Sequence, residues 1–262
     1  MKISRIITVF ILLAAIGVMG YSGFQVYEAD QGYKEGNAAY EDLRDRIKVN
    51  DVSPEETEEK PQIYIPQIGI DHEKLKTVNN DAVAWLYCPD TVIDYPVMKA
   101  KDYNYYLRRL PDGTWNANGS LFIDYNNAPD FSDPLTVIYG HHMKSGAMFG
   151  SLKGYKSQTY YEQHPFMYLY TGHGNYRIDL LYGCVIEAGQ WSASGFMFSE
   201  NIEKLLDYAA DNTTFKSNIE YSEGDRIAAL STCSYEFDNA RYVVLGILRD
   251  EYSVDFYGTI RK

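Results

Sequence analysis

The chain is predicted to be a mainly β protein in which about eight short strands form a closed barrel or a sandwich. Strand-forming side chains are abundant, with 25 tyrosines among 262 residues and many Val, Ile and Phe residues. From Gln62 onward, apolar runs of strand length alternate with turn sequences such as Pro111-Asp112-Gly113. Little helix is expected between these runs. A chain of this length can hold one good-sized domain with accessory segments.

The first element of the chain is an apolar N-terminal segment. No charged residue occurs from Ile6 to Phe24, and 19 helical residues extend about 28 Å, close to the ~30 Å hydrocarbon thickness of a bilayer. Lys2 and Arg5 precede this segment and acidic residues follow it, a pattern that places the N-terminus in the cytoplasm. A cleaved signal peptide is the alternative, although its apolar region usually has only about 7–15 residues. We therefore expect residues 1–27 to form a cytoplasmic tip and a single-pass membrane anchor.

The next segment, residues 28–62, is predicted to be an acidic, solvated stalk. Eleven acidic and five basic residues between Glu28 and Lys60 give it a net charge of −6, half of the −12 of the whole chain. One helical stripe within it carries Tyr33, Tyr40, Leu43 and Ile47. This helix either stands between the membrane and the domain or packs on the flank of the domain. Asn50–Pro61 contains two prolines and is predicted to be a linker.

Residues 63–262 are expected to form the β domain. The predicted strands are Ala84–Cys88, Val92–Val97, Ser120–Asp124, Leu135–Gly140, Phe166–Thr171, Tyr176–Ala188, Arg226–Cys233 and Arg241–Arg249. One amphipathic helix interrupts them, with Ser199 as its N-cap. Its apolar positions, at i, i+3, i+4 and i+7, are Ile202, Leu205, Leu206 and Ala209.

Composition argues against several classes of function. The net charge of −12 argues against nucleic-acid binding, because phosphates would be repelled. The three cysteines form no CxxC motif and the histidines no HExxH motif, so neither a metal nor another cofactor is expected. Cys88 and Cys184 lie in apolar runs and are predicted to be buried, inert thiols. Whether these two cysteines pair stays open at this stage.

The remaining cysteine, Cys233, ends the apolar run Ile227–Thr232. A short polar loop follows, and Arg241 then opens a second apolar run, Tyr242–Leu248. Two such runs joined by a short loop predict an antiparallel hairpin. In a hairpin the end of one strand lies beside the start of the next, so the thiol and the guanidinium are expected at the same end of the sheet.

A nucleophilic cysteine needs a base, because a free thiol with a pKa of about 8.5 is only a few per cent thiolate at neutral pH. His141 and His142 follow the run Leu135–Gly140, so they also stand where a strand ends. Adjacent residues of an extended chain point to opposite faces, so only one of the two is expected to face the cysteine. The other three histidines, His72, His164 and His173, are predicted to be surface residues.

Arg241 admits two interpretations. Its guanidinium either pairs with Asp238 or Glu236 on the surface, or it donates hydrogen bonds to an oxyanion that develops beside the thiol. The second role stabilises a transition state by about 3 kcal/mol. Arginine cannot act as the base, because its pKa exceeds about 12.

Several segments resemble those of one enzyme family. The segment LSTCSYEFDNARYVVLGIL (Leu230–Leu248) resembles the active-site segment of the sortases, in which a Leu-x-Thr-Cys strand end precedes an arginine on the next strand. TVIYGHHMKSGAMFGSLKGY (Thr136–Tyr155) resembles their histidine segment. Resemblance to class B sortases in particular is carried by Trp85–Leu107, Gly119–Asn127 and the helix Ser199–Asp211. The similarity extends over Ile63–Arg249, with the motifs in the same order.

The resemblance implies a closed eight-stranded β-barrel with N-terminal helices and one inserted helix before the cysteine strand. It also implies a transpeptidase anchored on a Gram-positive cell surface, with its catalytic domain outside. In that reaction the cysteine attacks the carbonyl that follows a threonine in a C-terminal sorting signal and forms a thioester to the clipped surface protein. An amine, typically from a peptidoglycan cross-bridge, then resolves the thioester.

Carried over by position, Cys233 is the nucleophile, His141 the general acid and base, and Arg241 the stabiliser of substrate and oxyanion. Ser231 and Thr232 are expected to line the groove beside the thiol. His142 departs from the family, which usually has a polar residue such as asparagine there, and it either tunes His141 or is a tolerated surface residue. Two alternatives remain open, a cysteine peptidase that hydrolyses the same thioester and a non-catalytic surface-anchored β domain.

Overall fold

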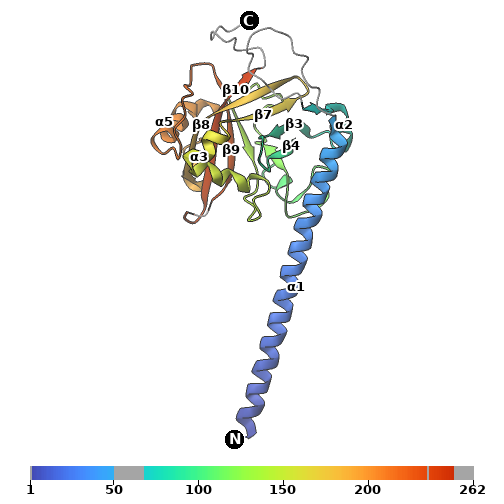
Figure 1. Cartoon of the computed structure of the whole chain (residues 1–262). Coiled ribbons are helices and arrows are strands. Elements are labelled where there is room, and N and C mark those ends of the chain that lie inside the picture. Colours follow the sequence, from blue (N-terminus) through green and yellow to red (C-terminus); the bar gives the residue numbers. More distant parts are fainter. Residues whose placement is uncertain (1, 50–67, 235, 251–262) are drawn as a thin grey trace.

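A closed eight-stranded barrel stands beside the end of one long helix in the computed structural model, which describes residues 2–49, 68–234 and 236–250 (Figure 1). The barrel strands are β3 (Ala82–Tyr87), β4 (Asp94–Lys99), β5 (Leu121–Ile123), β6 (Leu135–Tyr139), β7 (Phe166–Thr171), β8 (Gly174–Glu187), β9 (Arg226–Cys233) and β10 (Ala240–Asp250). Every predicted strand is confirmed, with its ends within two residues of the expected ones. The sheet closes into a barrel, so a sandwich is excluded.

The strands follow one another around the barrel in the order β10-β8-β7-β3-β4-β5-β6-β9. The β4–β5 and β6–β9 pairs are parallel and the other pairs are antiparallel. The β6–β9 pair closes the barrel and joins the histidine strand to the cysteine strand. A separate two-stranded sheet contains β1 (Lys48–Val49) and β2 (Gly69–Ile70).

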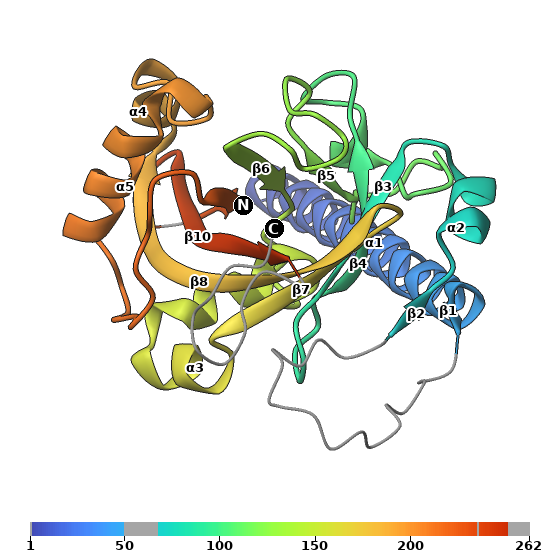
Figure 2. The same ribbon diagram turned by 90° about the horizontal axis from the view of Figure 1, so that it is seen from above.

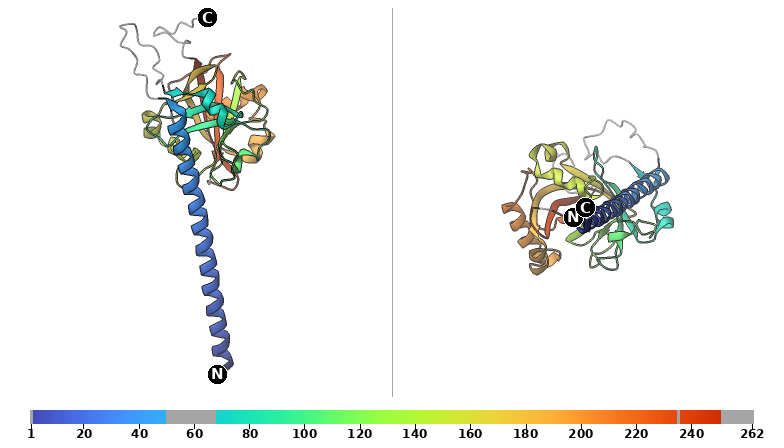
Figure 3. Two further views of the ribbon diagram at one scale, coloured as in Figure 1. Left: turned by 90° about the vertical axis from the view of Figure 1, so that its right-hand side faces the viewer. Right: turned by 90° about the horizontal axis from the view of Figure 1, so that it is seen from below.

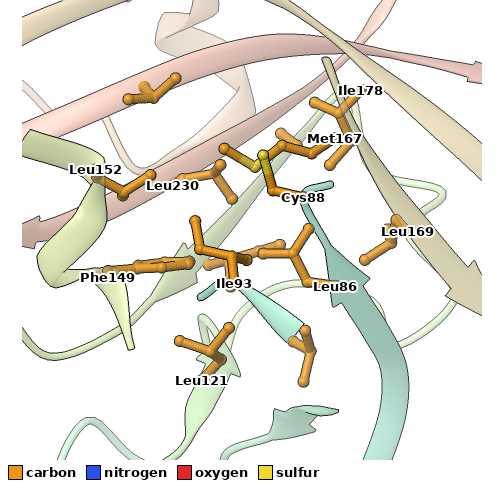
Figure 4. Close-up of a cluster of buried hydrophobic side chains, with 14 of the residues drawn as sticks. Leu86, Cys88, Ile93, Leu121, Phe149, Leu152, Met167, Leu169, Ile178 and Leu230 are labelled. Carbon is orange, nitrogen blue, oxygen red and sulfur yellow. The ribbon is translucent and has the colours of Figure 1, made fainter. Parts of the chain in front are cut away.

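The barrel wall is apolar on both faces because helices cover much of its outside. Ile138 and Leu230 point into the barrel interior, where Figure 4 shows Leu230 among the packed side chains. The next residues back along these strands, Val137 and Ala229, belong to an outer cluster instead, as the two-residue period of a strand requires. Strands that are buried on both faces need continuous apolar runs, and such runs made them predictable.

Helices cover two separate parts of the outer wall, as the view from above shows (Figure 2). One side is covered by α4 (Ala188–Ala193) and α5 (Ile202–Asp211), and the other by α1 (Lys2–Ile47) and α2 (His72–Val78). The remaining helical segments are η1 (Tyr106–Arg108), η2 (Phe149–Lys156), α3 (Gln158–Gln163) and η3 (Ser199–Asn201). The expectation of little helix therefore missed several short helices.

The inserted helix before the cysteine strand is present, but its start was predicted wrongly. Ser199 begins the 3-10 turn η3, and α5 starts at Ile202 after Asn201, without a side-chain cap hydrogen bond. The turn η3 takes up the three residues that the prediction had counted as the first helical turn. The buried face is as predicted, with Leu205, Leu206 and Ala209 packed on the barrel.

The apolar anchor segment and the first part of the predicted stalk form one continuous helix, α1, 46 residues long. Its N-terminal half extends away from the barrel (Figure 3), and its large apolar side chains from Ile7 to Tyr27 are exposed. Its last turns pack on the barrel flank, where Tyr40, Leu43 and Ile47 are buried, whereas Tyr33 remains 41% exposed. Of the two arrangements left open for this helix, the structure shows packing on the flank. The predicted linker, Asn50–Pro61, lies outside the described residues.

Candidate active site

The cysteine hairpin forms as predicted. β9 and β10 are antiparallel, and the register sets Arg241 directly opposite Cys233. Side chains of directly opposed residues emerge on the same face of the sheet, so the hairpin brings the guanidinium and the thiol together. On its other edge β9 pairs with β6 in parallel, with Tyr139 opposite Ser231. The chain that leaves β6 therefore carries Gly140 and His141 past the end of the cysteine strand.

One cavity of about 420 Å³ is lined by all five predicted site residues. These are His141, Ser231, Thr232, Cys233 and Arg241. The rest of the lining is mainly aromatic and apolar, and comprises Tyr103, Leu107, Phe122, Tyr139, Gly140, Ala188, Trp191, Ser192 and Met197. The cavity thus combines a polar, reactive corner with an apolar wall, the usual composition of a site that binds an organic substrate.

Cys233 differs from the other two cysteines in its exposure. Its side chain is exposed, whereas Cys88 and Cys184 are buried and unpaired, as predicted, and they form no disulfide. Burial raises the pKa of the Cys88 thiol, and it raises that of Cys184 to about 12. Both buried thiols therefore stay protonated at neutral pH. Only Cys233 presents an accessible sulfur that can act as a nucleophile.

The two adjacent histidines contact different groups. Nε2 of His141 lies 2.5 Å from the carbonyl oxygen of Leu107. A carbonyl oxygen only accepts hydrogen bonds, so the neutral ring carries its proton on Nε2 and keeps Nδ1 as the basic nitrogen. Nδ1 of His142 lies 2.7 Å from the carbonyl oxygen of Cys233. His142 is therefore bonded to the backbone of the cysteine, while His141 lines the cavity.

The guanidinium of Arg241 is half-buried, and no ion pair joins it to an acidic side chain of the described residues. Its Nη1 donates to the carbonyl oxygen of Ala240 at 3.3 Å. Glu236 is bonded to Lys156 instead, so the described part of the chain does not support a surface ion pair for Arg241. The pKa of Glu187 is lowered mainly by hydrogen bonds from the backbone N–H groups of Gly189 and Gln190. The nearby Arg241 guanidinium lowers this pKa further.

The two hydroxyl residues beside Cys233 have different surroundings. Thr232 Oγ1 donates to the carbonyl oxygen of Gly140 at 2.8 Å and so joins the end of β9 to the end of β6. The hydroxyl of Ser231 is buried and has no hydrogen-bond partner among the described residues. A buried hydroxyl without a partner is costly unless a ligand satisfies it. The Thr232 hydroxyl thus has a partner, whereas the Ser231 hydroxyl has none among the described residues.

Sequence reasoning missed the apolar wall of the cavity. Trp191 lies in α4, and Met197 lies in the segment after this helix. The six residues of α4 are too few to show a helical period in the sequence. The hydroxyl of Tyr103 donates to Met197 Sδ at 3.4 Å, and that of Tyr139 donates to Asp124 at 2.9 Å. Burial, and secondarily Asp124, raises the pKa of Tyr139, so this tyrosine remains a neutral donor.

The described residues contain no group of three or more His, Cys, Asp or Glu side chains that could hold a metal ion. No protein-family model matches the chain. A curated relative, the sortase B of Listeria monocytogenes serovar 1/2a, is 30% identical over 254 residues, which cover 95% of this chain and 99% of the relative. The sortase B of Staphylococcus aureus is 26% identical over 250 residues, with 94% and 97% covered.

Solved structures give the same relationship. Sortase B from B. anthracis superimposes with a TM-score of 0.66 at 26% identity, over 84% of this chain and 99% of that one. Sortase B from Clostridium perfringens superimposes with a TM-score of 0.64 at 28% identity, over 69% of this chain and 100% of that one. The S. aureus enzyme is 25% identical and covers 68% of this chain at a TM-score of 0.62, and its structures include a substrate complex. A further neighbour with the same values is a sortase B complexed with triglycine.

Proposed function

The chain belongs to the sortase B family of cysteine transpeptidases, and we propose that it cleaves a C-terminal sorting signal after threonine and transfers the surface protein to a cell-wall amine. One observation carries the proposal: Cys233, His141 and Arg241 line a single cavity at the end of the barrel. Structures of its relatives in complex with a substrate and with triglycine support a substrate and an amine acceptor for this site.

In the first step, the Cys233 thiolate attacks the backbone carbonyl carbon of the threonine. His141 holds the thiol proton and delivers it to the departing amine, so that the C–N bond breaks and a thioester forms. The hydrogen bond from His141 Nε2 to the Leu107 carbonyl fits this role, because it fixes the ring and leaves Nδ1 to exchange the proton.

Arg241 stabilises the negative charge that develops on the carbonyl oxygen. It stands opposite Cys233 in the β9–β10 ladder, and no carboxylate of the described residues neutralises it in an ion pair. Its fork of N–H donors suits an oxyanion or a peptide carbonyl. Ser231, whose hydroxyl is buried without a partner among the described residues, donates to or accepts from the bound signal.

In the second step, an amine attacks the thioester carbonyl and gives its proton to His141. The C–S bond breaks, the thiolate returns and a new peptide bond joins the surface protein to the acceptor. Water competes with the amine for the same thioester, and hydrolysis would make the protein a peptidase. The apolar wall of Trp191, Met197 and Phe122 supports transfer, because it offers a competing water molecule few hydrogen-bond partners.

The N-terminal helix supports a location at the cell membrane. The segment that starts at Ile7 is long and apolar enough to cross a bilayer, and none of its apolar window is buried in the protein. We propose a single-pass topology with the N-terminus in the cytoplasm, because Lys2 and Arg5 precede the span and acidic residues follow it. This arrangement holds the barrel outside the cell, where surface proteins and peptidoglycan precursors meet.

The test uses the full chain in detergent or vesicles and a panel of peptides with a fixed threonine and varied flanking residues. Each peptide is incubated with and without triglycine, and the products and the intact protein are weighed by mass spectrometry. Transfer predicts a triglycine-linked product, little hydrolysis and a thioester adduct on Cys233. Cleavage that ignores triglycine would assign a peptidase. No adduct and no cleavage across the panel would favour a non-catalytic β domain.

A further inference from the structure

An exposed cluster of aromatic and basic side chains lies outside the catalytic cavity. Trp115 is 67% exposed, more than any other large apolar side chain of the described residues beyond α1. It pairs through its backbone with Arg109, whose guanidinium stacks 4.5 Å from the ring centre of Tyr105. Arg108 beside it is exposed as well. We call Tyr105, Arg108, Arg109 and Trp115 the aromatic–basic patch.

The patch is fixed to α1 at the point where this helix leaves the barrel. The side chain of Asn116 donates to the carbonyl oxygen of Gly32 at 2.9 Å, and that of Asn118 donates to Asn37 at 3.0 Å. Gly36 fits tightly between them, because a Cβ there would lie 2.5 Å from the Asn118 amide. The N-terminal half of α1 extends from this end of the domain (Figures 1 and 3).

The geometry of α1 sets the height of the patch above a membrane. The charge-free span ends at Phe24, and Gly32 follows eight residues later, about 12 Å along a helix. The headgroup layer occupies about 5–7 Å of this distance. The remaining gap of roughly 5–7 Å is comparable with the reach of one large side chain, and a tilt of about 20°, common for membrane-spanning helices, narrows it further.

We propose that the aromatic–basic patch rests on the outer surface of the membrane that α1 spans. Tryptophan and tyrosine concentrate at bilayer interfaces, because their rings are apolar and their N–H or O–H groups find polar partners there. The guanidinium groups of Arg108 and Arg109 pair with lipid phosphates. The occupant is therefore a lipid surface. The proposal depends on the membrane anchoring put forward above and is independent of catalysis.

The contact would hold the barrel at a defined height. β9 ends at Cys233, and the end of β9 and the start of β10 lie at the same end of the barrel as the emerging half of α1 (Figure 1). A domain docked through the patch would thus present its thiol end close to the bilayer surface. A freely tumbling domain on a flexible stalk would present it at variable heights, and the continuous helix α1 argues against that arrangement.

Tryptophan fluorescence tests the contact directly. The chain has three tryptophans, and Trp85 and Trp191 are buried, so Trp115 is the exposed one. The full chain is inserted into vesicles whose lipids, in both leaflets, carry bromine on acyl carbons near the headgroup. We expect brominated lipids to quench part of the wild-type emission, up to the share of one tryptophan in three. Trp115→Phe should lose this quenching.

A matched control moves the probe along α1. Val92 is 47% exposed and shares a cavity with Asn37, Glu41 and Arg44 of α1. It therefore lies beside a part of α1 that is farther from the membrane span than the part beside Trp115. In a Trp115→Phe background, Val92→Trp should show no quenching by the same lipids. Equal quenching of wild type and Trp115→Phe would overturn the proposal, and so would quenching of the Val92→Trp probe. Because the measurement needs no turnover, a failed transpeptidase assay would leave its result interpretable.

Discussion

The two sides of the cavity are built from different kinds of structure. Cys233 and Arg241 stand on β9 and β10, and His141 lies two residues after the end of β6, so backbone hydrogen bonds of a closed barrel fix the reactive side. The apolar wall is more mixed: Phe122 and Tyr139 stand on β5 and β6, whereas Trp191 and Met197 come from a short helix and the segment after it. A closed barrel has no free strand edge at which it can open. The reactive groups are thus held rigidly, while the part of the apolar wall that carries Trp191 and Met197 lies outside the strand ladder.

This difference separates chemistry from recognition. Groups that exchange protons and charge within one reaction need positions fixed to a fraction of an ångström. A wall that accepts apolar side chains of a peptide tolerates more variation, because apolar contacts have little directional preference. Substitutions on the reactive side should therefore reduce turnover, and substitutions on the apolar wall should change substrate affinity.

Replacing the proposed nucleophile gives the largest expected effect. Cys233→Ala should abolish both cleavage and transfer, because no other accessible thiol remains among the three cysteines. Cys88→Ala removes a buried thiol and should keep most of the activity. Residual turnover of Cys233→Ala near the wild-type rate would exclude the thioester mechanism.

Alkylation checks the same contrast without a substrate. Burial raises the pKa values of Cys88 and Cys184, so both thiols remain protonated and shielded at pH 8. Iodoacetamide should add one group to the folded wild-type chain and none to Cys233→Ala, as measured by intact mass. Two or more groups on the folded chain would show that the buried thiols are accessible.

Substitutions of the two adjacent histidines should differ widely in their effect on kcat. His141→Ala removes the general acid and base and should lower kcat by about 10²–10⁴-fold. His142→Ala removes a hydrogen bond to the Cys233 carbonyl, worth about 1 kcal/mol, and should lower kcat by about tenfold or less. Steady-state kinetics of both variants decides the assignment. The opposite ranking would make His142 the proton carrier.

Arg241 tests whether shape or charge stabilises the oxyanion. Arg241→Lys keeps the positive charge but loses the planar fork of donors. We expect kcat/KM to fall by about 10²–10³-fold, the usual cost of losing one oxyanion donor. A lysine variant within a factor of a few of wild type would show that charge alone suffices.

The reactive side was largely predictable from local sequence, and the apolar wall was not. The runs that flank Cys233 and Arg241 already specify a hairpin, because strand period and loop length are local properties. Closure of the barrel depends on the β6–β9 pair, whose residues are about ninety positions apart. α4 has only six residues, too few for a helical period. The hydrogen bond between His142 and the Cys233 carbonyl is a tertiary contact that local sequence does not predict.

A substitution in the apolar wall should weaken the affinity for the peptide substrate. Tyr103 lines the cavity and is 38% exposed, so Tyr103→Ala removes an aromatic surface without opening the core. We expect KM for the peptide to rise about tenfold, since one lost apolar contact costs about 1–3 kcal/mol, with kcat nearly unchanged. Tyr105→Ala is the matched control, because Tyr105 is similarly exposed and does not line the cavity. A drop in kcat with KM unchanged would place Tyr103 on the reactive side.

The smallest effect is expected at the joint between the two strands that carry the reactive groups. Thr232 Oγ1 donates to the Gly140 carbonyl, one residue before His141. Thr232→Val keeps the shape of the side chain and removes this bond, which should lower the free energy of unfolding by about 1 kcal/mol. Denaturant unfolding measures this loss, and kcat should fall only a few-fold, because the β6–β9 ladder remains.

Ser231→Ala is the control for Thr232→Val, since it removes a buried hydroxyl that has no partner among the described residues. Stability should then stay within about 0.5 kcal/mol of wild type, while the KM for the peptide rises because a substrate partner is lost. Thr232→Val thus tests the contact between the strands, and Ser231→Ala tests the contact with the substrate. If Thr232→Val were as stable as wild type, the rigidity of the reactive side would come from the strand ladder alone.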